Sequence, residues 1–352
     1  MPPRPADMGG QRRAASPPSP PPARPAAVPR PLAWRLFVIV SIQLGFLGAI
    51  LFLSACYTPS AKLTALDLLS LPGERVELRA KIEVDGPGLF NPDLKGVELE
   101  FLGAAAAAQG QGGAPPVSRD PREGPGPDAA ALGSGSSGAD GFARLDTVAP
   151  SAPGIYSYWV RARGQPNLKL REPAALLTLA VIAKEQPVLI TDIDGTICGT
   201  RVARLQRILA DEAEEVEPLP DAAAVLTQAA RKDAVIYLTA RSTYLAHRTK
   251  RWLAAHGFPA GPVLMRDLHA QWTSLSFSEG DFKERVIHDE VKRRWPEVRW
   301  GIGNTLGDAL AYAENGVRAV IIGDVRSQLP DRYRDLVRSA RDWTEVKGAI
   351  LP

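Results

Sequence analysis

Two aspartates one residue apart, Asp192 and Asp194, follow an apolar run in residues 187–197, which read PVLITDIDGTI. The apolar run predicts a buried parallel strand. At the C-terminal end of such a strand, two carboxylates on one face project into the crevice where open α/β sheets bind ligands. Like charges this close repel unless a cation lies between them or one takes a proton. Gly195 lets the chain turn away, and the Thr196 hydroxyl can hold that turn. The segment predicts either a carboxylate-based catalytic site or only a strand ending in an acidic turn.

Two later side chains are predicted to bind phosphate. Residues 234–242 form a second predicted strand, which ends in Thr239 and Arg241, and a hydroxyl there can donate to a phosphoryl oxygen. Lys283 lies in the first turn of a helix predicted over residues 281–288, where its ammonium is a point charge for phosphate. Taken singly, Thr239 could be an ordinary strand end and Lys283 a solvated helix residue.

Asn304 and Asp308 lie four residues apart in residues 299–308, where a predicted strand runs into a polar loop. Two hard oxygen ligands suit Mg²⁺, although the same pair could be a capped turn. All the motifs occur in the order that a doubly wound sheet requires, each at a predicted strand end or helix start. That order favours a site for phosphoryl transfer over four unrelated surface features.

The pattern Asp-x-Asp-x-Thr after an apolar strand resembles the nucleophile motif of the haloacid-dehalogenase-like (HAD) phosphohydrolases. HAD enzymes usually carry Gly-Asp in the last motif, and Gly-Asn with an aspartate four residues on resembles the lipin variant. The resemblance to the catalytic domain of lipin-type phosphatidate phosphatases covers about residues 186–336, and the actin-patch-associated phosphatidate phosphatases are similar around residues 262–267. Four segments carry the lipin resemblance: DIDGTI at 192–197, TAR at 239–241, PAGPVL at 259–264 and GNTLGDALAY at 303–312.

This resemblance implies Asp192 as nucleophile, Asp194 as general acid/base and Mg²⁺ as cofactor. A carboxylate that attacks phosphorus forms an aspartyl-phosphate, which splits one hard displacement into two easier ones. The expected phosphate-binding residues are Thr239 and Lys283, with Arg241 as a further contact to phosphate or lipid. The expected metal ligands are Asp192, the backbone carbonyl of Asp194, Asn304 and Asp308.

The connection between residues 197 and 234 is too short for a large cap domain. A capless site suits a bulky or surface-held substrate, so we expect phosphatidic acid or a related lipid phosphate. One alternative is a phosphatase of proteins or soluble phosphates. Another is a non-catalytic sensor of phosphatidic acid. The lipin-type domain also occurs in some phosphatidylinositol-transfer proteins, and some of these bind phosphatidic acid without hydrolysing it. Asp194 argues against the sensor, since binding alone needs no acid/base.

The chain is expected to have four parts. Residues 1–31 are rich in Pro, Ala and Arg and are predicted to be disordered. Residues 32–57 contain an apolar run long enough to span a bilayer. Residues 64–184 show short alternating strands typical of an immunoglobulin-like β-sandwich, interrupted by an Ala/Gly/Pro/Ser-rich insert at 103–138 that is predicted to be disordered. Residues 186–352 form the expected HAD-like doubly wound parallel sheet.

The charges around the apolar run predict its orientation. Arg24, Arg30 and Arg35 precede the run, so the positive-inside rule places the catalytic domain outside the cytoplasm. Residues 53–56 also match a bacterial lipoprotein cleavage box that ends in Cys56, which leaves two alternatives. The protein is then either held in a bacterial inner membrane by an uncleaved anchor or is a lipoprotein.

The charge composition limits the kinds of binding partner that are expected. With 42 basic and 39 acidic residues the charge is nearly balanced, so nucleic acid is not an expected partner. Protein partners are not indicated. One local cluster suits an anionic membrane surface, although a solvated helix face would look the same. It consists of Arg241, His247, Arg248, Lys250, Arg251 and Trp252.

Overall fold

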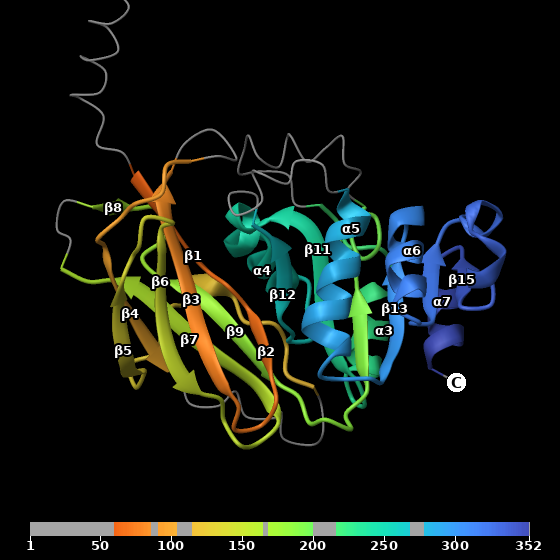
Figure 1. Cartoon of the computed structure of the whole chain (residues 1–352), viewed down its shortest axis with the longest axis horizontal. Coiled ribbons are helices and arrows are strands. Elements are labelled where there is room, and N and C mark those ends of the chain that lie inside the picture. Colours follow the sequence, from red (N-terminus) through yellow and green to blue (C-terminus); the bar gives the residue numbers. More distant parts are fainter. Residues whose placement is uncertain are drawn as a thin grey trace, which may run out of the picture. The chain divides into compact units, whose positions relative to one another are not determined.

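The computed structural model describes residues 60–85, 91–103, 115–164, 168–199, 216–267 and 278–351. Pro59–Pro352 is one compact unit, in which a β domain (residues 60–182) precedes an α/β domain (residues 187–351), as Figure 1 shows. The predicted disordered N-terminus at 1–31 and the predicted anchor at 32–57, with Cys56, lie outside the described residues. Among the described residues, no helix has the length and apolarity needed to cross a bilayer.

Two sheets build the β domain around one core. Their strand orders are β6-β3-β1-β8 and β2-β9-β7-β4-β5. Leu63 and Ile82 of the first sheet pack in the same cluster as Phe101 and Leu177 of the second, so both sheets bury one face against each other. The immunoglobulin-like class remains a prediction. The strands are β1 (Ser60–Ala65), β2 (Leu68–Ser70), β3 (Arg75–Val84), β4 (Glu98–Gly103), β5 (Ala130–Ser136), β6 (Phe142–Val148), β7 (Gly154–Ala162), β8 (Lys169–Leu170) and β9 (Ala175–Val181).

The prediction of disorder throughout 103–138 was wrong for β5, which pairs antiparallel with β4. Its small residues had suggested a chain unable to pack. In the structure they allow a close approach, because a Cβ on Gly135 would lie 2.7 Å from the carbonyl oxygen of Arg144 in β6. Main-chain hydrogen bonds to β4 hold this largely exposed edge strand, and its glycines allow the close approach to β6.

The second half of β3 is buried on both faces. The alternation along this strand predicts a half-buried strand with its charged residues in water, which holds only for its first half. Lys81 is 4% exposed, and its Nζ lies 3.2 Å from Asp93 Oδ1 and 3.8 Å from Asp267 Oδ1. Since Asp267 follows β12 (Val263–Arg266) of the α/β domain, this face of the sheet is covered by the second domain.

A six-stranded parallel sheet with the order β12-β11-β10-β13-β14-β15 forms the centre of the α/β domain. The strand that comes first along the chain, β10, contains four consecutive apolar or β-branched residues. All four are buried, as expected for a parallel strand covered on both faces. The strands are β10 (Val188–Thr191), β11 (Ala234–Ser242), β12 (Val263–Arg266), β13 (Val298–Gly303), β14 (Ala319–Ile322) and β15 (Val337–Ala340). The helices are α3 (Ala222–Ala229), α4 (Ala246–Ala255), α5 (Glu279–Val286), which continues into a π-helical turn (Ile287–Lys292), α6 (Leu306–Glu314) and α7 (Trp343–Ile350).

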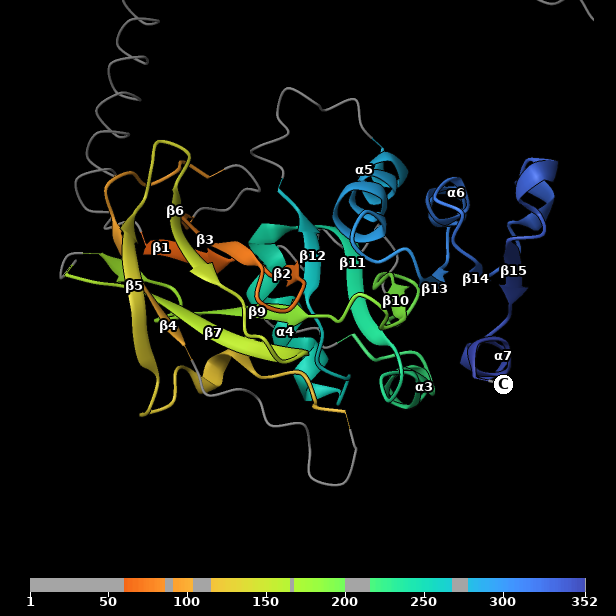
Figure 2. The same cartoon turned by 60° about the horizontal axis from the view of Figure 1, so that its bottom comes forward.

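Helices cover both faces of this sheet. Val188 and Ile190 of β10 pack with α5 and α6, whereas Leu189 between them packs with α3 and α7. Figure 2 shows the two helix layers on opposite sides of the strands. The strand order reverses between β10 and β13, so the crevice at their carboxyl ends is where such a sheet binds ligands. The predicted absence of a large cap rests on the connection from β10 to β11, in which α3 is described and residues 200–215 are not.

Candidate active site

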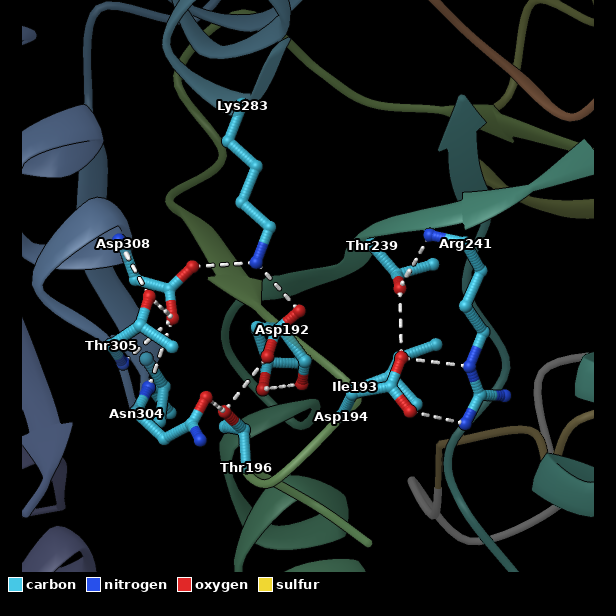
Figure 3. A network of polar contacts seen from close by, with 12 residues as sticks. Asp192, Ile193, Asp194, Thr196, Thr239, Arg241, Lys283, Asn304, Thr305 and Asp308 are labelled. Atoms are coloured by element: carbon cyan, nitrogen blue, oxygen red, sulfur yellow. Dashed lines mark hydrogen bonds and ion pairs between the residues drawn. The ribbon is translucent and has the colours of Figure 1, made fainter. Parts of the chain in front are cut away.

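The carboxylate of Asp192 lies at the carboxyl end of β10 and is 3% exposed. Its Oδ1 accepts a hydrogen bond from Lys283 Nζ at 2.7 Å, and its Oδ2 accepts one from Thr196 Oγ1 at 3.0 Å. Burial raises the pKa of Asp192 to about 7, although Lys283 opposes the rise. The residue is therefore a buried carboxylate held between a cation and a hydroxyl, as Figure 3 shows.

Lys283 joins Asp192 to Asp308. Its Nζ lies 2.5 Å from Asp308 Oδ1, and both its carboxylate partners are buried. Burial alone would lower the pKa of Lys283, but the two carboxylates hold it above its ordinary value. Burial would likewise raise the pKa of Asp308, but Lys283 holds it below its ordinary value. The three groups form an ion triad with one more negative than positive charge.

Asp308 is also the N3 residue of the capping box that begins α6, in which Thr305 is the N-cap. Its Oδ2 accepts from Asn304 N at 3.0 Å, from Thr305 N at 3.0 Å and from Thr305 Oγ1 at 2.9 Å. Thr305 Oγ1 accepts in turn from Asp308 N, which completes a capping box. The capped-turn alternative therefore holds for Asp308, and the same carboxylate also contacts Lys283.

The turn after the aspartates requires a glycine. Gly195 has φ +74°, and a Cβ there would lie 2.2 Å from Asn304 Nδ2. This close approach brings the Asn304 amide beside Thr196, whose Oγ1 lies 3.2 Å from Asn304 Oδ1. Trp343 Nε1 donates to the Thr196 carbonyl at 2.7 Å and fixes the turn from below.

Asp194 faces the opposite side of the site. Arg241 at the end of β11 donates from Nε to Oδ2 at 2.8 Å and from Nη2 to Oδ1 at 2.7 Å. Thr239 Oγ1 lies 3.4 Å from Asp194 Oδ2, so it contacts the acid/base candidate. Thr249 of α4 accepts from Arg241 Nη1 at 3.1 Å.

The structure brings all the predicted site residues to one edge of the sheet, in two groups. One group surrounds Asp192 and the other surrounds Asp194 (Figure 3). The role assigned to Arg241, a contact to phosphate or lipid, is not the contact observed, because its guanidinium binds Asp194. The predicted membrane-facing role of Lys250 was wrong, since this lysine is 5% exposed and its Nζ lies 2.6 Å from Asp67 Oδ1 of the β domain.

Three threonines support the site without having been assigned to it from the sequence. Thr196 was expected only to hold a turn, yet its hydroxyl contacts two candidate metal ligands. Thr305 could have been identified, because Thr-x-x-Asp before a helix is a capping-box pattern. Thr249 carries no local signal, since its contact with Arg241 depends on how α4 packs.

The oxygen atoms suitable for a metal ion are those of Asp192 and Asn304. Within the described residues, no group of three or more His, Cys, Asp or Glu side chains could hold a metal. Asp192 Oδ2 and Asn304 Oδ1, however, both lie within hydrogen-bond distance of Thr196 Oγ1, so two hard oxygens converge. Asp308 Oδ2 accepts three hydrogen bonds in the capping box and its Oδ1 accepts one from Lys283, whereas Asp192 Oδ2 and Asn304 Oδ1 have only the Thr196 hydroxyl as a donor among the described contacts. The donor set therefore fits Mg²⁺ through Asp192 and Asn304 better than through Asp308.

Comparison with known proteins gives one family match. Residues 187–315 match the model of the phosphatidate phosphatase APP1 catalytic domain, which is somewhat more than a third of the chain. No curated protein matches the sequence.

Three solved structures illustrate how distant the structural likenesses are. A structure of PhoD has 8% identity and a TM-score of 0.26, and the match covers 58% of this chain and 37% of that one, so the chain spans little more than a third of its length. An Escherichia coli alpha-2-macroglobulin structure spanning domains NIE-MG1 has 17% identity and a TM-score of 0.18, and the match covers 34% of this chain and 60% of that one. A Bacteroides vulgatus beta-glycosidase has 8% identity and a TM-score of 0.24, and the match covers 70% of this chain and 29% of that one. At these TM-scores the likenesses carry no argument. The family match, which spans both aspartates, Lys283 and Asn304, supports a phosphatidate phosphatase-like enzyme.

Proposed function

We propose that this protein is a Mg²⁺-dependent phosphomonoester hydrolase that acts through an aspartyl-phosphate on Asp192, with phosphatidic acid or a related lipid phosphate as substrate. The observation that carries the proposal is the position of Asp192. Its carboxylate lies at the topological switch point of a parallel sheet, beside a buried ammonium and four residues from a hydroxyl that orients it. The family match and the motif order support assigning the sheet to the HAD-like class.

Asp192 performs the first displacement. One of its carboxylate oxygens forms a bond to phosphorus while the bond from phosphorus to the leaving alkoxide oxygen breaks. Lys283 holds the carboxylate in place and presents its positive charge where negative charge lies on the phosphoryl oxygens. The Thr196 hydroxyl contacts Asp192 Oδ2, which leaves the carboxylate few orientations.

Asp194 carries out both proton transfers. In the first step protonated Asp194 gives its proton to the leaving oxygen and becomes the carboxylate that Arg241 holds. In the second step water attacks phosphorus, the bond from phosphorus to Asp192 breaks, and the proton of the water returns to Asp194. Asp192 is regenerated, and inorganic phosphate leaves.

The charges of the site support a cation. When ionised, Asp194 is balanced by Arg241, whereas Asp192 and Asp308 share Lys283. Asp192 and Asn304 would hold Mg²⁺, with the backbone carbonyl of Asp194 as the predicted third ligand. When bound, Mg²⁺ supplies positive charge to the phosphoryl oxygens and offsets the excess carboxylate.

A lipid phosphate is the substrate class that the chain supports best. The family match is to a phosphatidate phosphatase domain, and residues 32–57 carry the predicted membrane anchor. An anchored enzyme meets lipid substrate at high local concentration, and the acyl chains add binding energy remote from the reacting phosphate. We propose the same extracytoplasmic, membrane-held location that the flanking arginines predict.

Phosphate release from a panel of substrates tests this proposal. The panel contains phosphatidic acid in mixed micelles, glycerol phosphate and a phosphopeptide, each with Mg²⁺ and with a chelator. We expect Mg²⁺-dependent release, with a much higher kcat/KM on phosphatidic acid than on glycerol phosphate. Equal kcat/KM values would favour a general phosphatase, and binding of phosphatidic acid with no release from any substrate would favour the sensor.

A further inference from the structure

The guanidinium of Arg241 is turned toward Asp194 and is almost closed to solvent. Its side chain is 9% exposed, and two of its nitrogens contact the two oxygens of the Asp194 carboxylate at 2.7 and 2.8 Å. Such a two-point contact fixes the plane of a carboxylate as well as its position. Figure 3 shows the pair beside Thr239, away from Lys283.

Two of the three remaining N–H groups of Arg241 also have partners. Nη1 donates to Thr249 Oγ1, and Nη2 also donates to Cys198 Sγ at 3.7 Å. A guanidinium has five N–H groups, so four of them have partners inside the protein. The group is therefore poorly placed to bind a phosphoryl oxygen.

Asp194 has little else to hold it. Its only other side-chain hydrogen bond among the described contacts is the long one from Thr239 at 3.4 Å. The chain turns sharply at Gly195, directly after this residue. The register between β11 and β12 shifts between Thr239 and Ser242, and such an irregularity beside a site commonly re-aims a side chain, here that of Arg241.

We propose that Arg241 is a positioning residue that aims the Asp194 carboxylate at the leaving oxygen, and that it is not a contact for phosphate or lipid. The inference rests on the proposed function, in which Asp194 is the general acid/base. Thr249 of α4 accepts a hydrogen bond from Arg241, so the orientation of the Asp194 carboxylate also depends on the packing of that helix.

Substrates that differ in leaving group test this role. A general acid matters most when the leaving alcohol is a poor leaving group, as in glycerol phosphate, and least for p-nitrophenyl phosphate. We expect Arg241→Ala to lower kcat on glycerol phosphate by about 10²–10³-fold, near the range for loss of a general acid, and to lower kcat on the aryl phosphate by less than about tenfold. KM should change little, because no phosphate contact is lost. Arg241→Lys, which keeps the charge but cannot bridge both oxygens, should fall between.

Two further variants separate the possible failures. Asp194→Asn should show the same dependence on the leaving group; if it does not, the proposed role of Asp194 fails with the inference. Suppose that Asp194→Asn shows the dependence on the leaving group. If Arg241→Ala then lowers kcat equally on both substrates, or changes only KM by raising it, Arg241 does not position the acid. Arg299→Ala removes a partly buried arginine that pairs with Asp233 elsewhere in the same sheet, and it should leave both rates unchanged.

Chemical rescue distinguishes positioning from a general loss of structure. Added guanidinium ion should restore part of the glycerol phosphate rate of Arg241→Ala and none of the rate of Asp194→Asn. Retained thermal unfolding temperature in Arg241→Ala, with no rescue and no dependence on the leaving group, would overturn the inference. If Arg241→Ala does not fold, the same comparison of leaving groups in Arg241→Lys decides it.

Discussion

Lys283 and Lys250 are both buried and both pair with aspartates, but their surroundings differ. Lys283 lies in the site between two carboxylates, those of Asp192 and Asp308. Lys250 lies between the domains and pairs with one carboxylate, that of Asp67, which also accepts from the backbone N–H groups of Thr178 and Val263. Lys250 itself also donates to the Leu176 carbonyl at 2.5 Å.

The difference is in charge balance. The Lys250–Asp67 pair is neutral. Its three further partners are backbone groups, the N–H groups of Thr178 and Val263 and the carbonyl of Leu176, so the pair links β9, β12 and α4 as a structural contact. The Lys283 triad has an excess carboxylate, and burial raises the pKa of Asp192 to about 7. A buried ion pair alone does not indicate a catalytic site, whereas an unbalanced one at a strand end does.

Replacing the aspartate in each pair gives the largest expected contrast. Asp192→Asn removes the proposed nucleophile and should abolish phosphate release, while the thermal unfolding temperature stays the same or rises because a surplus buried charge is gone. Asp67→Asn should keep kcat within a few-fold but lower the free energy of unfolding by about 3–5 kcal/mol, as when one partner of a buried pair is removed. Normal turnover by Asp192→Asn would remove the basis for the comparison.

Replacing the lysines tests the same contrast from the other side. Lys283→Met should lower kcat by about 10²–10³-fold, the loss typical when a group that stabilises transition-state charge is removed. Lys250→Met should lower the free energy of unfolding and leave kcat nearly unchanged. Rate assays and denaturant unfolding on both variants check this, and equal losses of kcat would show that the interface also carries catalytic charge.

Removal of one oxygen ligand tests the cation that the charge excess favours. Asn304→Ala should raise the Mg²⁺ concentration for half-maximal activity by at least the roughly 10–100-fold typical of a group that supports a metal site. Asn315→Ala, at the other end of α6, is the matched control because, within the part of the chain that the structure describes, its amide contacts backbone carbonyls, those of Glu284 and Ala311. An unchanged Mg²⁺ requirement in Asn304→Ala would exclude this residue as a ligand.

The smallest expected effect is a pH dependence of stability at the domain interface. Burial, helped by Lys62, lowers the pKa of His247 in α4 to about 4 from 6.5. The folded protein thus binds this proton less readily than the unfolded chain, so stability present above pH 6.5 is lost as the pH falls toward 4. His247→Gln should flatten that loss, by at most about 1.4 kcal/mol per pH unit, in denaturant unfolding measured across this range. The exposed His288→Gln serves as control, and an identical pH profile for His247→Gln and the unchanged protein would contradict the prediction.

Much of the site could be predicted because strand ends are local features. The apolar run before Asp192 coincides with β10, and the helix that presents Lys283 is α5, with a capping box of Ser278 and Asp281 at its start. The order of the motifs then placed their residues at one edge of the sheet.

The remaining features depend on how the two domains pack. The sequence of α4 shows Arg248, Lys250 and Arg251 together, but only tertiary structure decides that the β domain covers Lys250. The same holds for Lys81, whose position in an alternating strand predicts exposure. The partner of Arg241 could not be inferred either, because an arginine at a strand end contacts phosphate or carboxylate with similar ease.

The most direct test of the central claim is to trap the covalent intermediate. The enzyme is mixed with phosphatidic acid and Mg²⁺, quenched in acid during turnover, digested and analysed by mass spectrometry. We predict one added phosphoryl group on the peptide that contains Asp192, and none when Asp192→Asn is treated in the same way. Steady hydrolysis of phosphatidic acid with no phosphoryl group on Asp192, or with the group on another residue, would contradict the account.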